Sequence, residues 1–267
     1  MTLKKLKTLF STSSIGLTFF VGQSFANSAY MVYDFTQNKV LESKNQNQSL
    51  PIASITKLMT ANVFLEHNKN KNCSTKILPS DKDFLKNTTS RLPKNVEISC
   101  HELLKAMLVR SDNYAAHALA HATNLSKEQF INEMNRTAKR LGMKNTYFAD
   151  SSGLSSENVS SVADLVKLTS YSLKKKKLIN ISSLRSTEVY ANGKTIPMTN
   201  TNKLIRENIW EGALSKTGYT KEAGYNLVFV PNASCNGSVV GVISLNNDSS
   251  QSRSNFTNQK LLKYHCL

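Results

Sequence analysis

The sequence is poor in several features that mark specialised protein classes. Its 267 residues include 10 Gly, 5 Pro and 4 Cys, and 18 acidic residues stand against 34 Lys and Arg. Four Cys are too few for a small disulfide scaffold, and a 40% apolar fraction is too high for a disordered chain. No repeat of fixed period is visible, which argues against a solenoid. The length therefore predicts one large globular domain, or two small ones, with a substantial core.

Long apolar runs are also missing. The stretch IGLTFFV at 15–21 is well short of the roughly 20 residues that cross a bilayer. Three lysines precede it, and small residues occupy positions −3 and −1 of a cut after Ala26. This pattern favours a secretory signal peptide over residues 1–26 rather than a membrane anchor, with a mature, exported domain over 27–267.

The formal charge of +16 falls to +13 when that segment is removed, because three Lys and no acid are lost. Such a charge suits nucleic acid or an anionic surface. Export and the absence of a nucleic-acid motif argue against nucleic acid. The abundance of Asn, Lys and Ser indicates that a composition bias explains the charge about equally well. The lysine run at 174–177 is more typical of a solvated helix face or loop.

The four cysteines, Cys73, Cys100, Cys235 and Cys266, are expected to form two disulfides in an oxidising compartment. Three pairings are open. We favour Cys73–Cys100 with Cys235–Cys266, because the first pair brackets a segment with two strand-like patches. No C-x-x-C pattern supports a redox or zinc site.

The order of predicted elements indicates an α+β fold. Strands are expected at 30–35, 39–42, 213–219, 225–230 and 238–245, and helices at 54–66, 101–122 with a break at 111–113, 127–141, 162–173 and 254–264. Strands at both ends of the chain predict one five-stranded antiparallel sheet flanked by helices. A mainly helical second lobe, about 68–209, is inserted between the sheet segments and leaves a cleft for a site.

The first chemical motif is Ser54-Ile55-Thr56-Lys57, at the start of a predicted helix. Residues three apart share a helix face, so Lys57 can reach the Ser54 hydroxyl. A serine needs a base to become a nucleophile, and a lysine is a base only when neutral. Burial and a nearby cation would both lower its pKa.

Two further motifs complete the set. Ser111-Asp112-Asn113 lies at the helix break, where a hydroxyl can relay a proton and the Asn113 amide can hold a substrate carbonyl. Lys216-Thr217-Gly218 lies on a predicted strand. Its Lys and Thr can bind a carboxylate, its Gly leaves room for substrate along the strand edge, and Lys216 can be the cation beside Lys57. Each motif alone is weak, but the ordered set is the one found in penicillin-binding proteins and class A β-lactamases.

These motifs and their surroundings resemble the low-molecular-mass penicillin-binding proteins, the D-alanyl-D-alanine carboxypeptidases and endopeptidases. The resemblance covers nearly all of the mature chain and rests on the segments PIASITKLMTA, LGMKNTYFADSSGL, NVSSVADL and LSKTGYTKEAGYNLV. MTNTNKLI is most similar to the endopeptidase branch. The resemblance implies a β-lactamase/DD-peptidase-like fold.

The resemblance also implies an acyl-enzyme mechanism on peptidoglycan stem peptides. Ser54 would be the nucleophile, Lys57 the base, and Ser111 the proton donor to the leaving amine. Asn113, Lys216, Thr217 and Gly218 would bind substrate, and the backbone N–H groups of Ser54 and Tyr219 would form the oxyanion hole. β-Lactam antibiotics would acylate Ser54, and no metal or organic cofactor is implied.

The chain stops without the second β-rich domain and amphipathic helix of anchored relatives, which predicts a monomeric periplasmic enzyme, soluble or loosely associated with membrane or wall. Tyr219 stands where anchored carboxypeptidases often have His. Endopeptidase activity is favoured, with carboxypeptidase activity as the alternative.

Three other functions fit the sequence less well. A β-lactamase would need a Glu-x-x-Leu-Asn loop, which the stretch DSSGLSSENVSS lacks. A non-catalytic peptidoglycan-binding protein would have lost a motif residue. A zinc peptidase would need the His-Glu-x-x-His pattern, whereas His117 and His121 stand alone on their helix.

Overall fold

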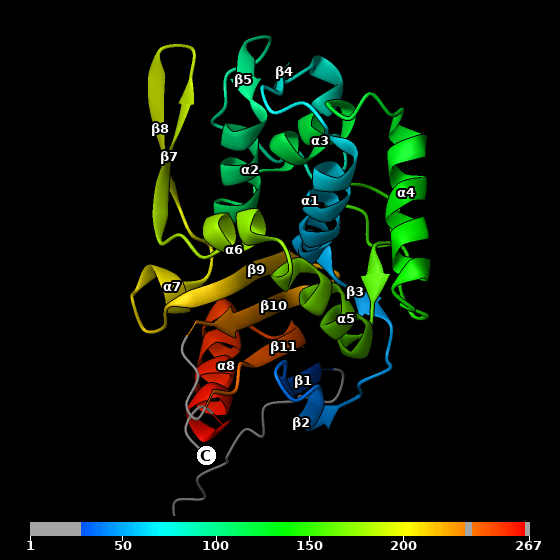
Figure 1. The fold of residues 1–267 in the computed structure, drawn as a ribbon, viewed down its shortest axis with the longest axis vertical. Helices are drawn as coiled ribbons and strands as arrows, with labels where there is room; N and C mark the ends of the chain where they lie inside the picture. Colours follow the sequence, from blue (N-terminus) through cyan, green and yellow to red (C-terminus); the bar gives the residue numbers. More distant parts are fainter. Residues whose placement is uncertain (1–27, 233–236, 265–267) are drawn as a thin grey trace, which may run out of the picture.

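A five-stranded antiparallel sheet is built from both ends of the chain in a computed structural model, which describes residues 28–232 and 237–264 (Figure 1). The strands are β1 (Ala29–Asp34), β2 (Lys39–Lys44), β9 (Gly212–Thr220), β10 (Gly224–Pro231) and β11 (Val240–Asn247). Their order is β2-β1-β11-β10-β9, and β1 pairs with β11 in antiparallel register. The predicted sheet is confirmed.

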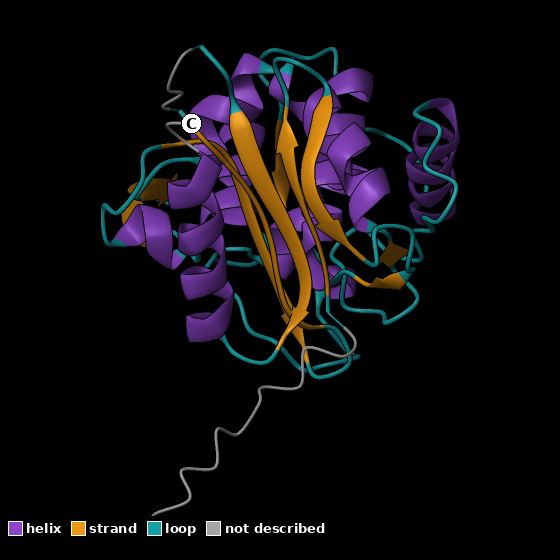
Figure 2. Cartoon of the chain, turned by 90° about the horizontal axis from the view of Figure 1, so that it is seen from below, coloured by secondary structure: helices purple, strands orange, loops and turns teal. Residues whose placement is uncertain are grey.

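Both faces of this sheet are covered, as the alternation of side chains along β10 shows. Val228 and Val230 face the larger core beneath the helical lobe, whereas Leu227 and Phe229 face a smaller cluster. That second cluster includes Leu261 of α8 (Ser250–Tyr264), the helix that packs on β10 and β11. Figure 2 shows helices on either side of the strands. β10 is therefore buried from its third residue onward, and β9 beside it forms the sheet edge.

The buried helix α1 (Thr56–His67) runs from the sheet into the helical lobe. It follows the short strand β3 (Leu50–Pro51) and a 3₁₀ turn over Ala53–Ile55. The sequence predicts a helix from Ser54, but the first turn is wound as 3₁₀ helix instead. Nine consecutive residues, 56–64, are buried, so this helix has no solvent face before its last turn.

The helices of the second lobe begin at polar caps. They are α2 (Cys100–Val109), α3 (Asn113–His121), α4 (Lys127–Arg140) and α5 (Val162–Leu173). In each, the side chain before the first turn accepts a backbone N–H: Ser99, Asp112, Ser126 and Ser161. The predicted helices and the break between α2 and α3 are confirmed. Within the described residues, no helix has the length and apolar character needed to cross a membrane.

The lobe also contains short strands and helices that the sequence analysis does not predict, apart from two strand-like patches between Cys73 and Cys100. These are β4 (Ser74–Lys76), the 3₁₀ turn η2 (Pro79–Asp81), β5 (Glu97–Ser99), β6 (Val159–Ser160), α6 (Lys176–Ser182), β7 (Ser186–Ala191), β8 (Lys194–Thr199) and α7 (Lys203–Arg206). Strands β4 and β5 pair with each other, as do β7 and β8. The lobe is thus less purely helical than expected.

A disulfide between Cys73 and Cys100 connects the start of the β4–β5 hairpin to the start of α2. It closes a loop of 27 residues, which restricts the unfolded chain. This half of the favoured pairing is confirmed. Cys235, Cys266 and the predicted signal peptide lie outside the described residues.

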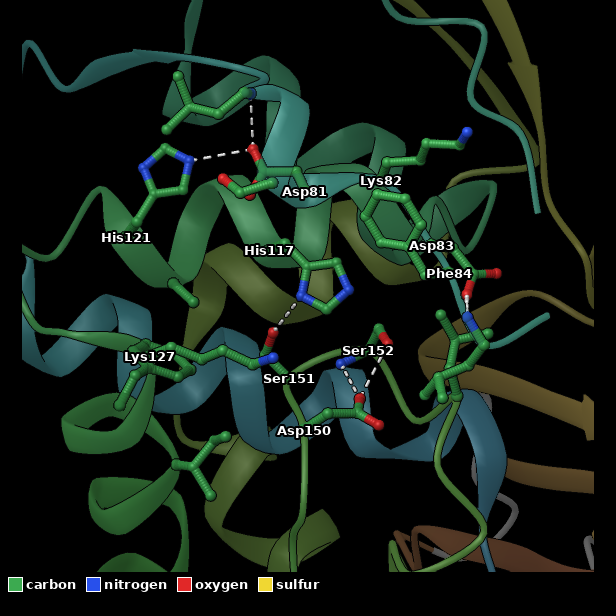
Figure 3. A pocket seen from close by; sticks show the side chains of 17 residues that line it. Asp81, Lys82, Asp83, Phe84, His117, His121, Lys127, Asp150, Ser151 and Ser152 are labelled. Carbon is green, nitrogen blue, oxygen red and sulfur yellow. Dashed lines mark hydrogen bonds and ion pairs between the residues drawn. The ribbon is translucent and has the colours of Figure 1, made fainter. Parts of the chain in front are cut away.

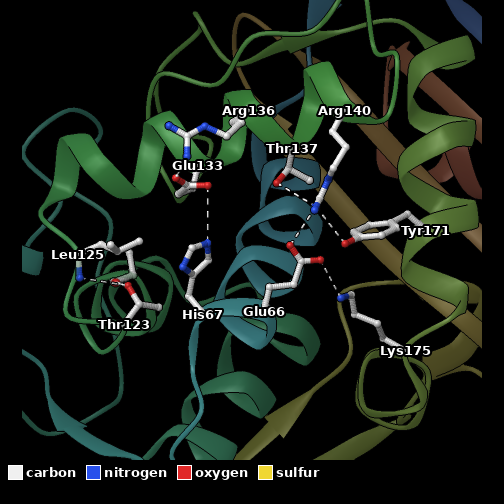
Figure 4. A network of polar contacts seen from close by, with 11 residues as sticks. Glu66, His67, Thr123, Leu125, Glu133, Arg136, Thr137, Arg140, Tyr171 and Lys175 are labelled. Atoms are coloured by element: carbon white, nitrogen blue, oxygen red, sulfur yellow. Dashed lines mark hydrogen bonds and ion pairs between the residues drawn. The ribbon is translucent and has the colours of Figure 1, made fainter.

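A cluster of paired charges surrounds the C-terminal end of α1 (Figure 4). Glu66 accepts a hydrogen bond from Arg140 of α4 at 3.0 Å and one from Lys175 at 3.1 Å. Arg140 also donates to the Tyr171 hydroxyl at 3.1 Å. The lysine run is therefore only partly a solvated surface, because Lys175 helps to join α1 to the α5–α6 junction.

Candidate active site

The amine of Lys57 lies at the centre of the predicted site. Its Nζ atom is 2.8 Å from Ser54 Oγ, 2.6 Å from Asn113 Oδ1 and 2.6 Å from the carbonyl oxygen of Ser152. A neutral amine has two N–H groups and one lone pair. The two carbonyl oxygens can only accept, so they take the two N–H groups and leave the lone pair for the Ser54 hydroxyl proton. This geometry prepares Lys57 to act as a base toward Ser54.

Burial makes the neutral form of Lys57 accessible. The side chain has no exposed surface, and burial lowers its pKa to about 7, although the charges of Asp150, Asp112 and Asp83 oppose this change. The sequence analysis expects the Lys216 cation to help lower the pKa of Lys57. In the structure, burial is the main cause for both lysines, and repulsion from Lys57 further lowers the pKa of Lys216.

Lys216 connects the sheet to the loop between α2 and α3. Its ammonium donates to Ser111 Oγ at 2.8 Å and to the carbonyl oxygen of Thr217 at 2.9 Å. The Thr217 hydroxyl lies 2.6 Å from that of Thr201. The three motifs, far apart in the sequence, therefore converge on one site, as predicted.

Backbone strain is concentrated at Ser111 and at Ala53, the residue before Ser54. Among residues 28–232 and 237–264, Ala53 and Ser111 are the only residues other than Asn and Gly that have positive φ, at 48° and 66°. Asn tolerates this region, whereas other side chains are strained there by roughly 1–3 kcal/mol each. Ala53 directly precedes the nucleophile candidate, and Ser111 is the predicted proton donor. The surrounding packing holds both in place.

Gly218 has a different role from the one expected. A Cβ at this position would lie 2.6 Å from the carbonyl oxygen of Ile52 and 3.2 Å from the backbone nitrogen of Ser54. The space is thus filled by the turn that carries the nucleophile, not left open for substrate. Glycine is required because β9 approaches that turn so closely.

Ser54 opens into a pocket of about 260 Å³ at the edge of β9. The lining residues are Ser54, Ser111, Thr201, Thr217, Gly218, Tyr219, Tyr225, Ser250 and Arg253. Tyr219, which is 55% exposed, stacks on Tyr225 with ring centroids 4.2 Å apart. The predicted oxyanion role of the Ser54 and Tyr219 N–H groups stays a prediction.

Arg253 of α8 is a pocket residue that the sequence analysis missed. Its guanidinium is buried and donates to the Asn226 carbonyl and the Ser250 hydroxyl, both at 3.2 Å. Its Nε atom has no hydrogen-bond partner. A guanidinium beside a pocket is suited to attract a carboxylate. No motif identifies it, because it stands in an otherwise polar terminal helix.

Asp150 shapes the loop that supplies the second carbonyl to Lys57. It accepts hydrogen bonds from the backbone nitrogens of Ser152, Gly153 and Ser155, so the loop wraps around its carboxylate (Figure 3). These bonds outweigh burial and hold the pKa of Asp150 below its usual value. The sequence signal was an Asp followed by Ser and Gly, which is typical of such turns.

The histidines of α3 do not form a metal site. His117 Nδ1 lies 3.1 Å from the Ser151 hydroxyl, and His121 Nε2 lies 3.1 Å from Asp81 (Figure 3). They line a separate pocket of about 340 Å³ between the 78–85 segment, α3, α4 and the Asp150 loop. Across the described part of the chain, no group of three or more His, Cys, Asp or Glu side chains could hold a metal ion.

Comparisons with known proteins give one consistent result. A family model described as D-alanyl-D-alanine carboxypeptidase matches residues 21–249. A D-alanyl-D-alanine endopeptidase of Haemophilus influenzae is 56% identical over 238 residues, which cover 89% of this chain and 82% of that protein. One of Escherichia coli is 38% identical, over 76% of this chain and 66% of that protein. The crystal structure of the Streptomyces K15 DD-transpeptidase superposes with a TM-score of 0.81 at 25% identity, covering 88% of this chain and 95% of that one.

Proposed function

Since the chain belongs to the D-alanyl-D-alanine carboxypeptidase family, we propose that Ser54 attacks the peptide bond that follows a D-alanine in peptidoglycan. The protein is a serine-type hydrolase that acts through an acyl-enzyme, and members of this family bind β-lactams. One observation supports the assignment of Ser54 above all. It is the short contact between Ser54 Oγ and the Lys57 amine, whose two N–H groups in the neutral form are taken by carbonyl oxygens.

The first chemical step is formation of the ester. Neutral Lys57 removes the Ser54 proton as Oγ attacks the carbonyl carbon, and the carbonyl oxygen becomes an oxyanion. The backbone N–H groups of Ser54 and Tyr219 would stabilise that charge. Collapse of the tetrahedral intermediate breaks the C–N bond, and water later attacks the ester and releases Ser54.

The leaving amine needs a proton, and Ser111 is placed to deliver it. Its hydroxyl accepts a hydrogen bond from Lys216, so its own proton is free to point into the pocket. Lys216 would pass a proton to Ser111 as Ser111 gives its own to the amine, so that the Ser111 hydroxyl is restored.

Two groups in the pocket fit the carboxylate at the end of a stem peptide. The hydroxyls of Thr217 and Thr201 stand together at one wall, and Arg253 lines another. Charge-assisted hydrogen bonds of this kind are strong in a buried setting. A carboxylate is present on the free D-alanine end and on the cross-linking residue alike.

We favour endopeptidase activity on cross-links over carboxypeptidase activity, because two relatives named D-alanyl-D-alanine endopeptidase align over most of the chain. The two activities differ only in the leaving amine. Digestion of purified cross-linked muropeptides, followed by chromatography, separates them. Conversion of dimers to monomers is expected. Release of terminal D-alanine with dimers intact would identify a carboxypeptidase instead.

The acyl-enzyme mechanism has its own test. Labelled penicillin should add its mass to Ser54 of the purified mature protein, and Ser54→Ala should abolish the adduct. Ser172→Ala is a matched control, because Ser172 belongs to the other Ser-x-x-Lys pattern and its hydroxyl is bonded to Leu168 inside a helix. If intact-mass analysis shows no adduct on the wild type, the acyl-enzyme mechanism is refuted.

Export through a signal peptide over residues 1–26, a periplasmic location and a monomeric state complete the proposal. The basic, apolar and small-residue regions of the N-terminus support export. The disulfide at Cys73–Cys100 supports an oxidising compartment. Cell fractionation and N-terminal sequencing would test the cut after Ala26, and sedimentation would test the monomer.

A further inference from the structure

The loop over residues 83–88 places one hydroxyl against the Asn113 amide. Asn113 Nδ2 donates to Thr88 Oγ1 at 2.8 Å. The Thr88 hydroxyl in turn donates to Asp83 Oδ2 at 2.7 Å. Asn113 Oδ1 accepts from Lys57 at 2.6 Å. A continuous chain of hydrogen bonds therefore runs from the Asp83 carboxylate to the catalytic amine.

Asp83 fixes which group donates and which accepts in each of these hydrogen bonds. An ionised carboxylate can only accept hydrogen bonds, so the single proton of the Thr88 hydroxyl is committed to Asp83. Thr88 Oγ1 can then only accept from Asn113. The Asn113 amide must turn its NH2 group to Thr88 and its oxygen to Lys57. A flipped amide would place an N–H group against the amine and leave Thr88 Oγ1 facing an oxygen.

Asp83 itself is held in place by its own loop. Its carboxylate is buried and accepts the backbone N–H groups of Leu85, Lys86 and Thr88 at 2.8–2.9 Å (Figure 3). Burial acts to raise its pKa, but these hydrogen bonds and the Thr88 hydroxyl outweigh it and lower the pKa. The carboxylate therefore stays an acceptor at neutral pH.

We propose that Asp83 and Thr88 are positioning residues that lock the orientation of the Asn113 amide and thereby keep a carbonyl acceptor on Lys57. This inference rests on the proposed function, because it assigns a task to the base of that reaction. It adds two residues outside the three motifs. Neither needs to touch substrate, since both act through Asn113.

The test is the pH profile of acylation by fluorescent penicillin in Thr88→Val, which removes the hydroxyl and keeps the shape. Without Thr88 Oγ1, the Asn113 amide can flip and withdraw its oxygen from Lys57. The protonated amine loses an acceptor that stabilised it. Loss of a hydrogen bond to a charged group is expected to lower the midpoint of the profile by about one pH unit and the plateau rate roughly tenfold.

Two companion variants sharpen this result. Thr88→Ser keeps the hydroxyl and should restore the wild-type midpoint. Thr89→Val is the matched control, because Thr89 is the exposed neighbour in the same loop and should change nothing. A fall in active fraction with the midpoint unmoved, or a Thr88→Ser variant as impaired as Thr88→Val, would overturn the proposal. If Thr88→Val does not fold, the midpoint of the pH profile is measured in Thr88→Ala, and the same criteria apply.

Thr88→Val removes one hydrogen bond from Asp83, but the backbone N–H groups of Leu85, Lys86 and Thr88 still donate to that carboxylate. The other titratable groups around Lys57 are not substituted in any of these variants. They are Asp112, His117, Asp150 and Lys216. The outcomes also distinguish a failure of the acyl-enzyme mechanism from a failure of the positioning role. An unacylated wild type would refute the acyl-enzyme mechanism, whereas an acylated wild type with an unchanged Thr88→Val profile would refute only the positioning role.

Discussion

The charged residues at the two ends of helix α1 lie in opposite environments. At the N-terminal end, Lys57 is fully buried and bonds to a hydroxyl and two carbonyl oxygens, none of them charged. At the C-terminal end, Glu66 is partly exposed and hydrogen-bonded to Arg140 and Lys175. Burial lowers the pKa of Lys57 to about 7, whereas cation hydrogen bonds outweigh burial and lower the pKa of Glu66.

This difference shows how one helix serves chemistry and structure at once. A cation whose acceptors are neutral can lose its proton near neutral pH and act as a base. A carboxylate paired with cations stays ionised and holds neighbouring helices together. The carboxylates of Asp83, Asp112 and Asp150 lie near Lys57 without bonding to it, because their oxygens accept from their own loops or caps. Their engagement keeps the amine free for Ser54.

The largest effect is expected from Lys57→Arg, which places a permanent cation at the N-terminal end of α1. Arginine stays protonated, so it cannot accept the Ser54 proton. We expect the second-order rate constant of penicillin acylation to fall about 10³-fold or more. Glu66→Gln, at the other end of the helix, should leave that rate constant unchanged. An arginine variant within tenfold of wild type would mean that another group is the base.

The pH dependence of acylation should carry the signature of Lys57. Below its pKa of about 7 the amine is protonated and inactive, so the rate should rise with pH and level off above that value. Each unit below the midpoint should reduce the rate about tenfold. Stopped-flow measurements from pH 5 to 9 would reveal this profile. A rate independent of pH over that range would argue against a neutral lysine base.

At the C-terminal end, Glu66→Gln should affect stability and not chemistry. Loss of the charge that pairs with Arg140 and Lys175 should reduce the free energy of unfolding by about 1 kcal/mol at neutral pH, since the group is partly exposed. Because the pKa of Glu66 is lower in the folded state, this stabilisation is present at neutral pH and lost as the pH falls. Urea titrations of both proteins should therefore converge at acid pH. A difference that persists there would indicate a packing effect.

The smallest effect is expected from Arg136→Ala, on α4 and without a contact to Glu66. Arg136 pairs with Glu133, but its side chain is 74% exposed. Solvent screens such a pair, so its removal should change the free energy of unfolding by less than about 0.5 kcal/mol. Thermal unfolding beside Glu66→Gln would show whether partial burial distinguishes the two ion pairs. Equal losses in both variants would weaken that distinction.

The sequence was sufficient to predict the sheet and most long helices, because their hydrophobic periodicity and turn signals are local. The β7–β8 hairpin was missed, although Asn192-Gly193 between two alternating segments is a hairpin signal. The 3₁₀ turn at Ser54 was also missed, because it depends on the strained Ala53 and on the close approach of β9. Tertiary contacts of that kind leave no periodic pattern.

The motif residues of the site were predictable because each stands in a recognisable short pattern. Arg253 and Thr88 were not, since each contacts a residue distant in the sequence, and Asp83 reaches the site only through Thr88. Gly218 stands in the third motif, but the reason for a glycine there differs from the one expected. Its neighbour in space is the Ser54 turn, and only the folded structure brings the two together.

The pairing of β1 with β11 has a consequence for the order in which the enzyme is made. The nucleophile and its base are synthesised early, whereas β9, which carries Lys216, comes late in the chain. A ribosome that stalls before Gly212 would release a product with Ser54 and Lys57 but no Lys216 beside Ser111. Because Lys216 lies on β9, the site can be complete only after the last third of the chain has been made. An unfinished chain would be unable to hydrolyse a cross-link, however intact its first half.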